Sequence, residues 1–409
     1  MRGKAPVSRF KNAPEFGYGR LGAFPRPGRV AAPAAEQPSR LMCPLLRGPY
    51  QNNGATPWYA ELPLGTPGQT LKIALDTGSN FIWTRSSLFT GGCRRTGKGQ
   101  FVYDQSRTFA WVDQADQKVS FGPWGNMIVE LGGDDIGLLP ECPLRSPFYL
   151  AKYYSGEQFA ELDWEAGIGF PSGSDFADPG IPLIVAELMN LGFADPEYPY
   201  LSFGADAAAG KGLCRIGGVD PGAFDPRSGI FMRWSPYMTL PGVQYIWSTA
   251  LNQYWVGDAL VASNAMFCLD SGSSQFKGDD GIMNETLRRV SGPNQPDVRL
   301  TLGATGDGGV GEITVPPSVY MVEIQAGPEQ GQVLPQFNPL GVADLVLVGS
   351  VLMDHLYTVF EYDVAQTPAG YHLAPVGMWL FNRPGGPELI RSRSKHPASV
   401  GARKPVHTP

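Results

Sequence analysis

The sequence predicts a fold that is all-β dominated, with two related β-rich halves and a few short helices. The 409 residues include 52 Gly and 38 Pro, which is typical of short strands separated by many turns. One short phrase also occurs twice. Residues 75–79 read Leu-Asp-Thr-Gly-Ser and residues 269–273 read Leu-Asp-Ser-Gly-Ser, and each follows an apolar run that indicates a buried strand.

The length allows two domains of ordinary size, each with its own core. With 43% hydrophobic and 17% charged residues, the composition is that of a globular protein. We expect a basic disordered arm, an N-terminal lobe, a C-terminal lobe and a basic disordered tail, in that order. Their predicted boundaries are 1–48, 49–222, 223–382 and 383–409.

The net charge of −6 is unevenly distributed. Nine basic residues against two acidic ones give the arm a charge of +7, and six against one give the tail +5, so the body carries −18. The acidity of the body either keeps it soluble or attracts basic peptides and tolerates acid. We expect no nucleic-acid partner and no membrane partner.

The cysteine pattern favours a reducing compartment. Five cysteines without close pairs match neither a disulfide framework nor a zinc site. The first 40 residues lack the apolar core of a secretory signal, and no stretch is long enough to span a bilayer. A cytoplasmic location without metal or other cofactor is therefore expected.

In the first half, alternation and turn residues predict strands around the first phrase. Residues 57–68 read as a strand and a turn, residues 70–75 as the strand that leads into Asp76, and residues 80–83 as the start of another strand. Residues 118–127 read as a hairpin with aromatic residues at its tip.

Beyond this hairpin, residues 182–191 have one apolar face and read as a helix that ends at Gly192. A linker is predicted near 220–233, and residues 284–290 read as a short helix. An apolar–Gly strand occurs in each half, as Ala166-Gly167-Ile168 and as Val348-Gly349-Ser350. Such an echo is what an internal duplication leaves.

At these positions the chain resembles the pepsin-like aspartic peptidases, from about Tyr59 to Val376. It resembles the bacterial members in lacking a secretory signal and the expected disulfides. The resemblance implies a bilobal fold with a long cleft between two pseudo-twofold-related lobes. The matching segments are 64–69, 76–79 with Trp83, 121–122, 163–169, 216–220, 270–274, 348–349 and 357–360.

The two aspartates of the repeated phrase are the predicted catalytic residues, Asp76 and Asp270. Two carboxyls in contact cannot both ionise, a behaviour for which pepsin is the standard example, so they share one proton. The ionised carboxyl takes a proton from water and the other protonates the substrate carbonyl. Which aspartate has which part stays open, because the pair titrates as a unit. Alternatively, both phrases are simple turns at strand ends.

The residues that follow each aspartate are expected to support the pair. The hydroxyls of Ser79 and Ser273 are placed to hydrogen-bond the outer carboxylate oxygens, while those of Thr77 and Ser271 would lock the two loops together. Two glycines would let backbone N–H groups approach the carboxylates; these are Gly78 and Gly272.

The hairpin tip matches the flap of the family, which covers the substrate, but Phe121 stands where Tyr is usual. The tip, Phe121-Gly122, keeps a ring above the substrate. Phe121 loses the hydrogen bond that Tyr makes to the residue matching Trp83. One net hydrogen bond contributes about 0.5–1.5 kcal/mol, so a looser flap and slower turnover are expected. Trp124 offers a substitute donor; alternatively, the aromatics only pack the hairpin.

Glu165 is a second departure, because the family prefers small or apolar residues there. One hypothesis is that its carboxylate faces the substrate pocket and prefers a basic side chain. The alternative is a solvated acid at the end of a strand.

The function that these residues predict is that of an aspartic endopeptidase. Its partners would be a polypeptide substrate in the cleft and the inhibitor pepstatin, and the protein is expected to be a monomer. The alternative is a catalytically weakened homologue that binds or inhibits peptides. A carboxylate-pair glycosidase needs acids spaced for a sugar ring, and it leaves the twin loops unexplained.

Overall fold

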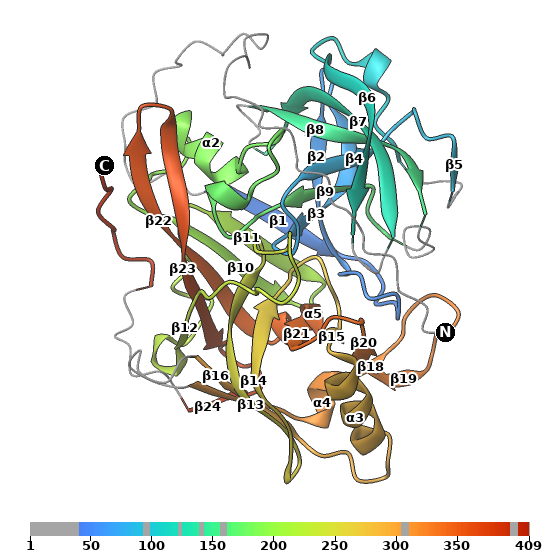
Figure 1. Cartoon of the computed structure of the whole chain (residues 1–409), viewed down its shortest axis with the longest axis vertical. Helices are drawn as coiled ribbons and strands as arrows, with labels where there is room; N and C mark the ends of the chain where they lie inside the picture. Colours follow the sequence, from blue (N-terminus) through green and yellow to red (C-terminus); the bar gives the residue numbers. More distant parts are fainter. Residues whose placement is uncertain are drawn as a thin grey trace, which may run out of the picture. The chain divides into compact units, whose positions relative to one another are not determined.

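The computed structural model describes residues 41–92, 99–121, 125–138, 143–155, 162–303, 311–392 and 400–408. These residues belong to one compact unit, and most of their regular structure is β-strand, which confirms the predicted fold class (Figure 1). The described strands form a large sheet, an eight-stranded sheet and a two-stranded ribbon. The ribbon consists of β18 (Met321–Glu323) and β19 (Val333–Pro335).

One part of the large sheet comes from the first half of the chain. In spatial order its path runs β2-β3-β9-β4-β8-β7-β6, with β5 beside β8. The bounds are β2 (Trp58–Leu64), β3 (Gln69–Asp76), β4 (Ile82–Arg85), β5 (Gly91–Gly92), β6 (Ala110–Ser120), β7 (Asn126–Ile136), β8 (Leu144–Tyr154) and β9 (Ala166–Gly169).

The second half forms the eight-stranded sheet in the order β20-β15-β21-β14-β13-β16-β17-β24. The bounds are β13 (Trp247–Val256), β14 (Ala259–Leu269), β15 (Phe276–Gly278), β16 (Val298–Leu302), β17 (Gly311–Val315), β20 (Phe337–Pro339), β21 (Leu345–Val348) and β24 (Ile390–Ser392).

The two halves repeat one strand arrangement. In the first, β3 pairs parallel with β9, β9 antiparallel with β4, and β4 parallel with β8. In the second, β14 pairs parallel with β21, β21 antiparallel with β15, and β15 parallel with β20. The register sets Leu75 opposite Ile168 and Leu269 opposite Val348. Gly349 is therefore the counterpart of Gly169, two residues beyond the Gly167 of the sequence echo.

The rest of the large sheet combines strands from both ends of the chain, in the order β12-β23-β22-β10-β11-β1. The bounds are β1 (Leu41–Arg47), β10 (Tyr200–Asp206), β11 (Lys211–Ile216), β12 (Ile230–Arg233), β22 (Leu356–Thr367) and β23 (Gly370–Asn382). The central contact pairs β10 with β22, so strands from both sides of the predicted boundary at 222–223 share one sheet. The boundary itself stays a prediction.

The strand β1 differs from the disorder predicted for residues 1–48. Leu41, Cys43 and Leu45 alternate with exposed residues and are buried, and the strand pairs with β11 over its length. This period-two pattern lies within a segment rich in Pro and Arg, where composition hides it. The remainder of the predicted arm lies outside the described residues.

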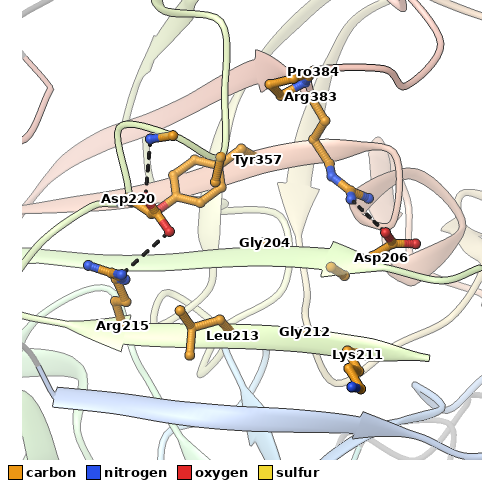
Figure 2. A pocket seen from close by; sticks show the side chains of 13 residues that line it. Gly204, Asp206, Lys211, Gly212, Leu213, Arg215, Asp220, Tyr357, Arg383 and Pro384 are labelled. Carbon is orange, nitrogen blue, oxygen red and sulfur yellow. Dashed lines mark hydrogen bonds and ion pairs between the residues drawn. The ribbon is translucent and has the colours of Figure 1, made fainter. Parts of the chain in front are cut away.

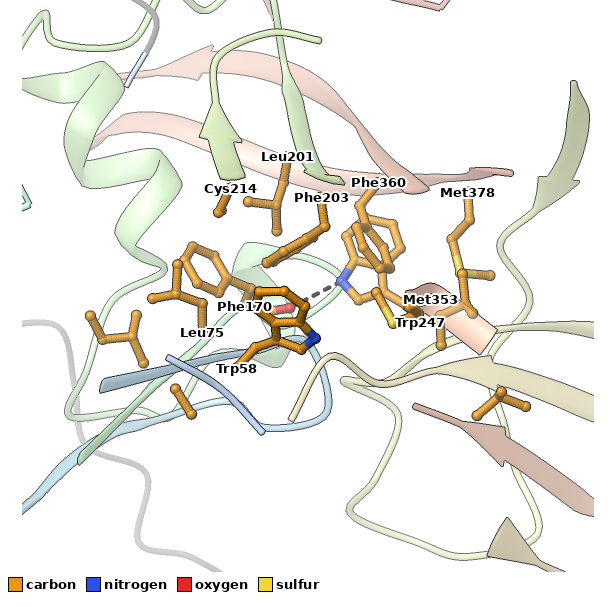
Figure 3. Close-up of a cluster of buried hydrophobic side chains, with 14 of the residues drawn as sticks. Trp58, Leu75, Phe170, Leu201, Phe203, Cys214, Trp247, Met353, Phe360 and Met378 are labelled. Atoms are coloured by element: carbon orange, nitrogen blue, oxygen red, sulfur yellow. Dashed lines mark hydrogen bonds between the residues drawn. The ribbon is translucent and has the colours of Figure 1, made fainter. Parts of the chain in front are cut away.

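Aromatic and aliphatic side chains from both halves pack together in one large buried cluster (Figure 3). Trp247 is fully buried and donates from Nε1 to the carbonyl of Phe170 at 3.0 Å. Its ring packs against Phe360, with ring centroids 5.1 Å apart. The side chains of β10, β13 and β22 thus bury the segment that follows β9 and hold the two halves together.

The described helices are short and lie mainly in the second half. Two match the helices predicted at 182–191 and 284–290, although the second begins four residues earlier, where Asp279 accepts from the N–H of Ile282. The helical segments are α2 (Ile184–Asn190), α3 (Asp280–Val290), α4 (Pro317–Tyr320), α5 (Ser350–Met353), η1 (Tyr103–Gln105), η3 (Ser174–Phe176) and η4 (Pro226–Ser228).

The described parts of residues 383–409 also differ from the predicted disorder. The strand β24 pairs with β17, and residues 400–408 run along the shared sheet. Lys404 forms an ion pair of 2.7 Å with Glu361, whose side chain is 3% exposed and also accepts from Trp379 Nε1. A buried carboxylate needs a nearby cation. Lys404, one of the basic residues on which the disorder prediction rested, therefore binds this segment to the sheet.

We expect Lys404→Met to lower the free energy of unfolding by about 1–2 kcal/mol, because it leaves the Glu361 carboxylate buried without its cation. Arg403→Met is the matched control. Arg403 pairs with Glu197, but its side chain is 68% exposed, so its loss should cost about 0.5 kcal/mol or less. Denaturant unfolding of both variants measures the difference, and equal losses would contradict this role of Lys404.

Candidate active site

The two aspartates of the repeated phrase meet at the ends of equivalent strands. Asp76 is the last residue of β3, and Asp270 directly follows β14. Their side chains hydrogen-bond one another, although 193 residues separate them in the sequence. Asp270 is 7% exposed. The structure therefore brings together the two residues predicted to be catalytic, while their catalytic role stays a prediction.

The glycines after the aspartates make this contact possible. The N–H of Gly78 donates to Asp76 Oδ1 at 2.8 Å, and the N–H of Gly272 donates to Asp270 Oδ1 at 2.9 Å. Each glycine also faces the opposite aspartate. A Cβ atom at Gly78 would overlap the carboxyl of Asp270, and one at Gly272 would overlap that of Asp76. No side chain larger than hydrogen fits at either position without moving the pair.

Four hydrogen bonds cross between the two loops. The N–H of Thr77 donates to Ser271 Oγ and the N–H of Ser271 donates to Thr77 Oγ1, both at 3.0 Å. The hydroxyls then donate further, Thr77 Oγ1 to the carbonyl of Leu269 at 3.2 Å and Ser271 Oγ to that of Leu75 at 2.6 Å. This reciprocal set, here called the crossbar, fixes the distance between the strands that end at the aspartates.

The outer carboxylate oxygens are held by the serines three residues after each aspartate. Ser273 Oγ donates to Asp270 Oδ2 at 2.5 Å, and the Ser79 hydroxyl hydrogen-bonds Asp76. Each carboxyl thus receives one backbone and one hydroxyl hydrogen bond from its own loop. These bonds offset part of the cost of burying the charge that the pair carries.

The pKa of Asp76 is raised well above its usual value, first by burial, then by the charge of Asp270 and by the hydrogen bond between the two carboxyls. The hydrogen bonds from Ser79 and Gly78 act in the opposite direction and lower it. One proton therefore stays on the pair at a pH where a free Asp, with a pKa of about 3.9, is ionised.

A second pair of glycines lies behind the loops. Gly169 and Gly349 donate to the carbonyls of Phe81 and Gln275 at 2.9 and 3.0 Å, at equivalent places in the two halves. A Cβ atom on Gly169 would lie 2.8 Å from the carbonyl oxygen of Ser79, and one on Gly349 would overlap that of Ser273. These contacts explain why each half carries an apolar–Gly strand.

The predicted flap residue Phe121 packs on aromatic rings of the first half. Its ring meets Phe81 and Trp83 edge to face, at centroid distances of 5.2 and 6.1 Å. Its N–H donates to the carbonyl of Gly125 at 2.9 Å and closes the hairpin between β6 and β7. Gly122 and Trp124 lie outside the described residues, so their predicted roles stay predictions.

Glu165 is buried, and its carboxylate accepts the backbone N–H of Lys72 at 2.8 Å. The residue also binds β3 through its own backbone, because its N–H donates to the Lys72 carbonyl at 2.8 Å. This burial does not match the alternative of a solvated strand-end acid. The hypothesis that Glu165 selects a basic substrate side chain stays a prediction.

Two residues that lie near the pair, Tyr245 and Lys277, are not among the predicted site residues. The charges of Asp76 and Asp270 raise the pKa of the Tyr245 phenol, which burial already raises. Lys277 is 1% exposed and donates from Nζ to Ser273 Oγ at 3.0 Å. One signal could have found Lys277: it follows Asp270 by seven residues, as Trp83 follows Asp76.

A cavity lies elsewhere, on the part of the large sheet that contains β10, β11 and β22 (Figure 2). It measures about 330 Å³, and its lining includes Arg215, Asp220 and Tyr357 but neither aspartate of the pair. Arg215 forms an ion pair of 3.4 Å with Asp220, and the backbone N–H of Asp220 donates to the Tyr357 hydroxyl at 2.8 Å.

The described part of the chain holds neither a metal-binding cluster nor a membrane-spanning helix. No cluster of three or more His, Cys, Asp or Glu side chains is arranged to hold a metal ion there. None of the helices described there is long and apolar enough to cross a membrane.

Comparison with known proteins agrees with this geometry. Residues 57–369 match the family model described as eukaryotic aspartyl protease, and the chain belongs to this family. It is 22% identical to pepsin A of Sus scrofa over 347 residues, covering 80% of this chain and 83% of that protein. It is also 22% identical to rhizopuspepsin-2 of Rhizopus niveus over 336 residues, covering 78% of each. The resemblance found in the sequence is therefore confirmed.

A third relative is a probable aspartic-type endopeptidase of Aspergillus fumigatus. It is 25% identical over 274 residues, which cover 61% of this chain and 52% of that protein. The agreement of three distant relatives supports aspartic endopeptidase function as a class.

The crossbar predicts a specific loss of stability. Thr77→Val keeps the shape of the buried side chain but removes the acceptor of Ser271 N–H and the donor to Leu269. We expect the free energy of unfolding to fall by about 2–3 kcal/mol, because two buried polar groups lose their partner. Thr77→Ser is the control: it keeps the hydroxyl and should cost about 1 kcal/mol, for one methyl group. Denaturant unfolding that ranks the two variants equally would contradict the crossbar.

Proposed function

We propose that this protein is an aspartic endopeptidase that hydrolyses peptide bonds by activating a water between Asp76 and Asp270. The observation that supports the proposal best is the direct hydrogen bond between the carboxyls of Asp76 and Asp270, which lie in matched loops. Membership of the aspartyl protease family gives the same class of activity.

In the proposed reaction the pair holds one proton and one negative charge. The ionised carboxyl accepts a proton from water as the water attacks the scissile carbonyl, and the protonated carboxyl donates to the carbonyl oxygen. The leaving nitrogen then receives a proton from the pair. The glycine N–H groups and serine hydroxyls keep the carboxyls in place while their charge shifts between the two. As the C–N bond breaks, a hydroxyl of the tetrahedral intermediate returns one proton to the pair. The attacking water and the two carboxyls thus account for every proton, and the proposed reaction uses no cofactor.

The substrate in this proposal is a polypeptide bound in a cleft between the lobes, as family membership implies. We also propose that pepstatin inhibits the enzyme and that the enzyme acts as a monomer. A cytoplasmic location remains a proposal, and the free thiols of Cys43, Cys214 and Cys268 are compatible with it.

A weakened, peptide-binding homologue is the second candidate, and one observation favours it. Phe121 lacks the hydroxyl that the family usually has on the flap, although its ring is still packed over Trp83. Binding without turnover would follow if the flap could not close firmly. Both aspartates and their complete supporting loops favour the enzyme instead.

Hydrolysis of a denatured protein, measured from strongly acidic to neutral pH with and without pepstatin, tests the proposal. Asp76→Asn and Asp270→Asn should each lower kcat by roughly 10³-fold or more, because neither leaves a shared proton. Peptide binding without hydrolysis at every pH would favour the second candidate.

Asp76→Asn should also leave the fold intact and more stable at neutral pH. The native pKa of Asp76 lies above its unfolded value, so the wild type loses stability as pH rises from the unfolded pKa to the native one. The amide does not ionise and avoids this loss. Thermal unfolding of the wild type and the variant at pH about 4 and about 7 measures this difference in stability. A variant less stable than the wild type at neutral pH would contradict the raised pKa.

Phe121→Tyr should raise kcat/KM about two- to tenfold, because a tyrosine hydroxyl adds about one net hydrogen bond to the closed flap. Phe121→Leu is the control for the ring and should lower kcat/KM, since it removes the edge-to-face contacts with Phe81 and Trp83. A tyrosine variant no faster than the wild type would show that the missing hydroxyl does not limit turnover.

A further inference from the structure

A buried lysine stands directly behind one carboxyl of the pair. Lys277 is the central residue of β15, between Leu347 of β21 and Asn338 of β20, and its side chain points toward the loop that carries Asp270. It is 1% exposed. An ammonium group is so costly to bury that a lysine at such a place is rare without a specific partner.

The hydrogen bonds of Lys277 connect it to the pair through one hydroxyl. Nζ donates to Ser273 Oγ at 3.0 Å, and Ser273 Oγ donates to Asp270 Oδ2 at 2.5 Å. Because the ammonium has only donors, it occupies a lone pair of Oγ and directs the hydroxyl hydrogen toward Asp270. Nζ also donates to the carbonyl of Gly54. Gly54 has a positive φ of 80°, and a Cβ there would lie 3.1 Å from Nζ.

The lysine breaks the symmetry of the two loops. Its counterpart in the first half is Trp83, which also follows its aspartate by seven residues and also pairs with the Gly-bearing strand. Trp83 is uncharged and packs among aromatic rings. Among the described residues, Asp270 therefore has a cation behind its serine, while Asp76 has an indole in the equivalent place.

The charges around Lys277 keep it cationic in acid. Burial lowers the pKa of Lys277 to about 7, and the carboxyls of Asp270 and Asp76 raise it against this effect. The other titratable groups near the pair stay neutral below this pH, because burial and the two carboxyls raise the pKa values of Tyr245 and Cys268. Tyr50, which donates to the carbonyl of Ser274, is neutral for the same reason of burial.

We propose that Lys277 is a positioning residue of the aspartate pair, which acts through Ser273 to hold the negative charge on Asp270 and the shared proton on Asp76. The inference rests on the proposed peptidase function. The ammonium stabilises negative charge on the pair, so each of the two carboxyls loses its proton more easily. The pH range in which the pair holds one proton therefore moves to lower pH. Asp270 then takes the proton from water, and Asp76 donates to the carbonyl.

The test is the pH profile of kcat for the full chain and three variants. Lys277→Met removes charge and hydrogen bonds at similar volume, and Lys277→Gln keeps an N–H donor without the charge. The matched control is Lys211→Met, which removes an exposed lysine at the start of β11. Thermal unfolding checks that each variant is folded.

We expect both limbs of the profile to move upward by about one pH unit in Lys277→Met and Lys277→Gln, because removing a cation a few ångströms from the pair raises the pKa of its carboxyls. The maximal kcat should fall about tenfold in the Met variant and less in the Gln variant, which still orients Ser273. Lys211→Met should not change the profile.

The outcomes separate the inference from the proposed function. A wild type without hydrolysis at any pH would refute the peptidase and this inference with it. An active wild type whose profile is unchanged in both Lys277 variants would overturn the inference alone. Loss of the fold in both variants would also overturn it, because Lys277 would then be a structural residue. A shift in the Met variant but not in the Gln variant would assign the effect to the hydrogen bond and contradict the role of the charge.

Discussion

The contact between two carboxyls is the constraint on which the rest of the structure depends. Two ionised carboxylates in a buried site repel each other strongly, so the contact persists only with one proton on the pair and with hydrogen bonds to the carboxylate oxygens. The backbone N–H groups of Gly78 and Gly272 and the hydroxyls of Ser79 and Ser273 supply these bonds. The crossbar then prevents the loops from relaxing apart.

The duplicated strand arrangement and the sheet to which both halves contribute hold the two loops in place. Each aspartate ends a strand that is paired in parallel with a Gly-bearing strand, and Gly169 and Gly349 let the loops approach these strands closely. The halves are joined through the sheet that contains β10 and β22 and through the core around Trp247. A shift of one half against the other would therefore break the crossbar and separate the carboxyls.

The sequence could predict the features that repeat or that follow a short period. The twin phrases predicted both loops, and the apolar face of residues 182–191 predicted α2. Composition gave the wrong prediction where a few residues determine the structure. The alternation of Leu41, Cys43 and Leu45 was hidden among Pro and Arg. The docking of Lys404 depends on Glu361, which is distant in the sequence. Lys277 was missed because its charge matters only after folding brings Gly54 and Ser273 around it.

The shared proton can be measured directly by infrared spectroscopy of the side-chain carboxyls. The difference spectrum between the wild type and Asp76→Asn isolates the carboxyl of Asp76 as pH is raised. We expect a protonated carboxyl at pH about 5, well above the usual Asp pKa of about 3.9, and its loss only at higher pH. A difference spectrum in which Asp76 is already ionised near pH 4 would contradict the shared proton and the chemistry built on it.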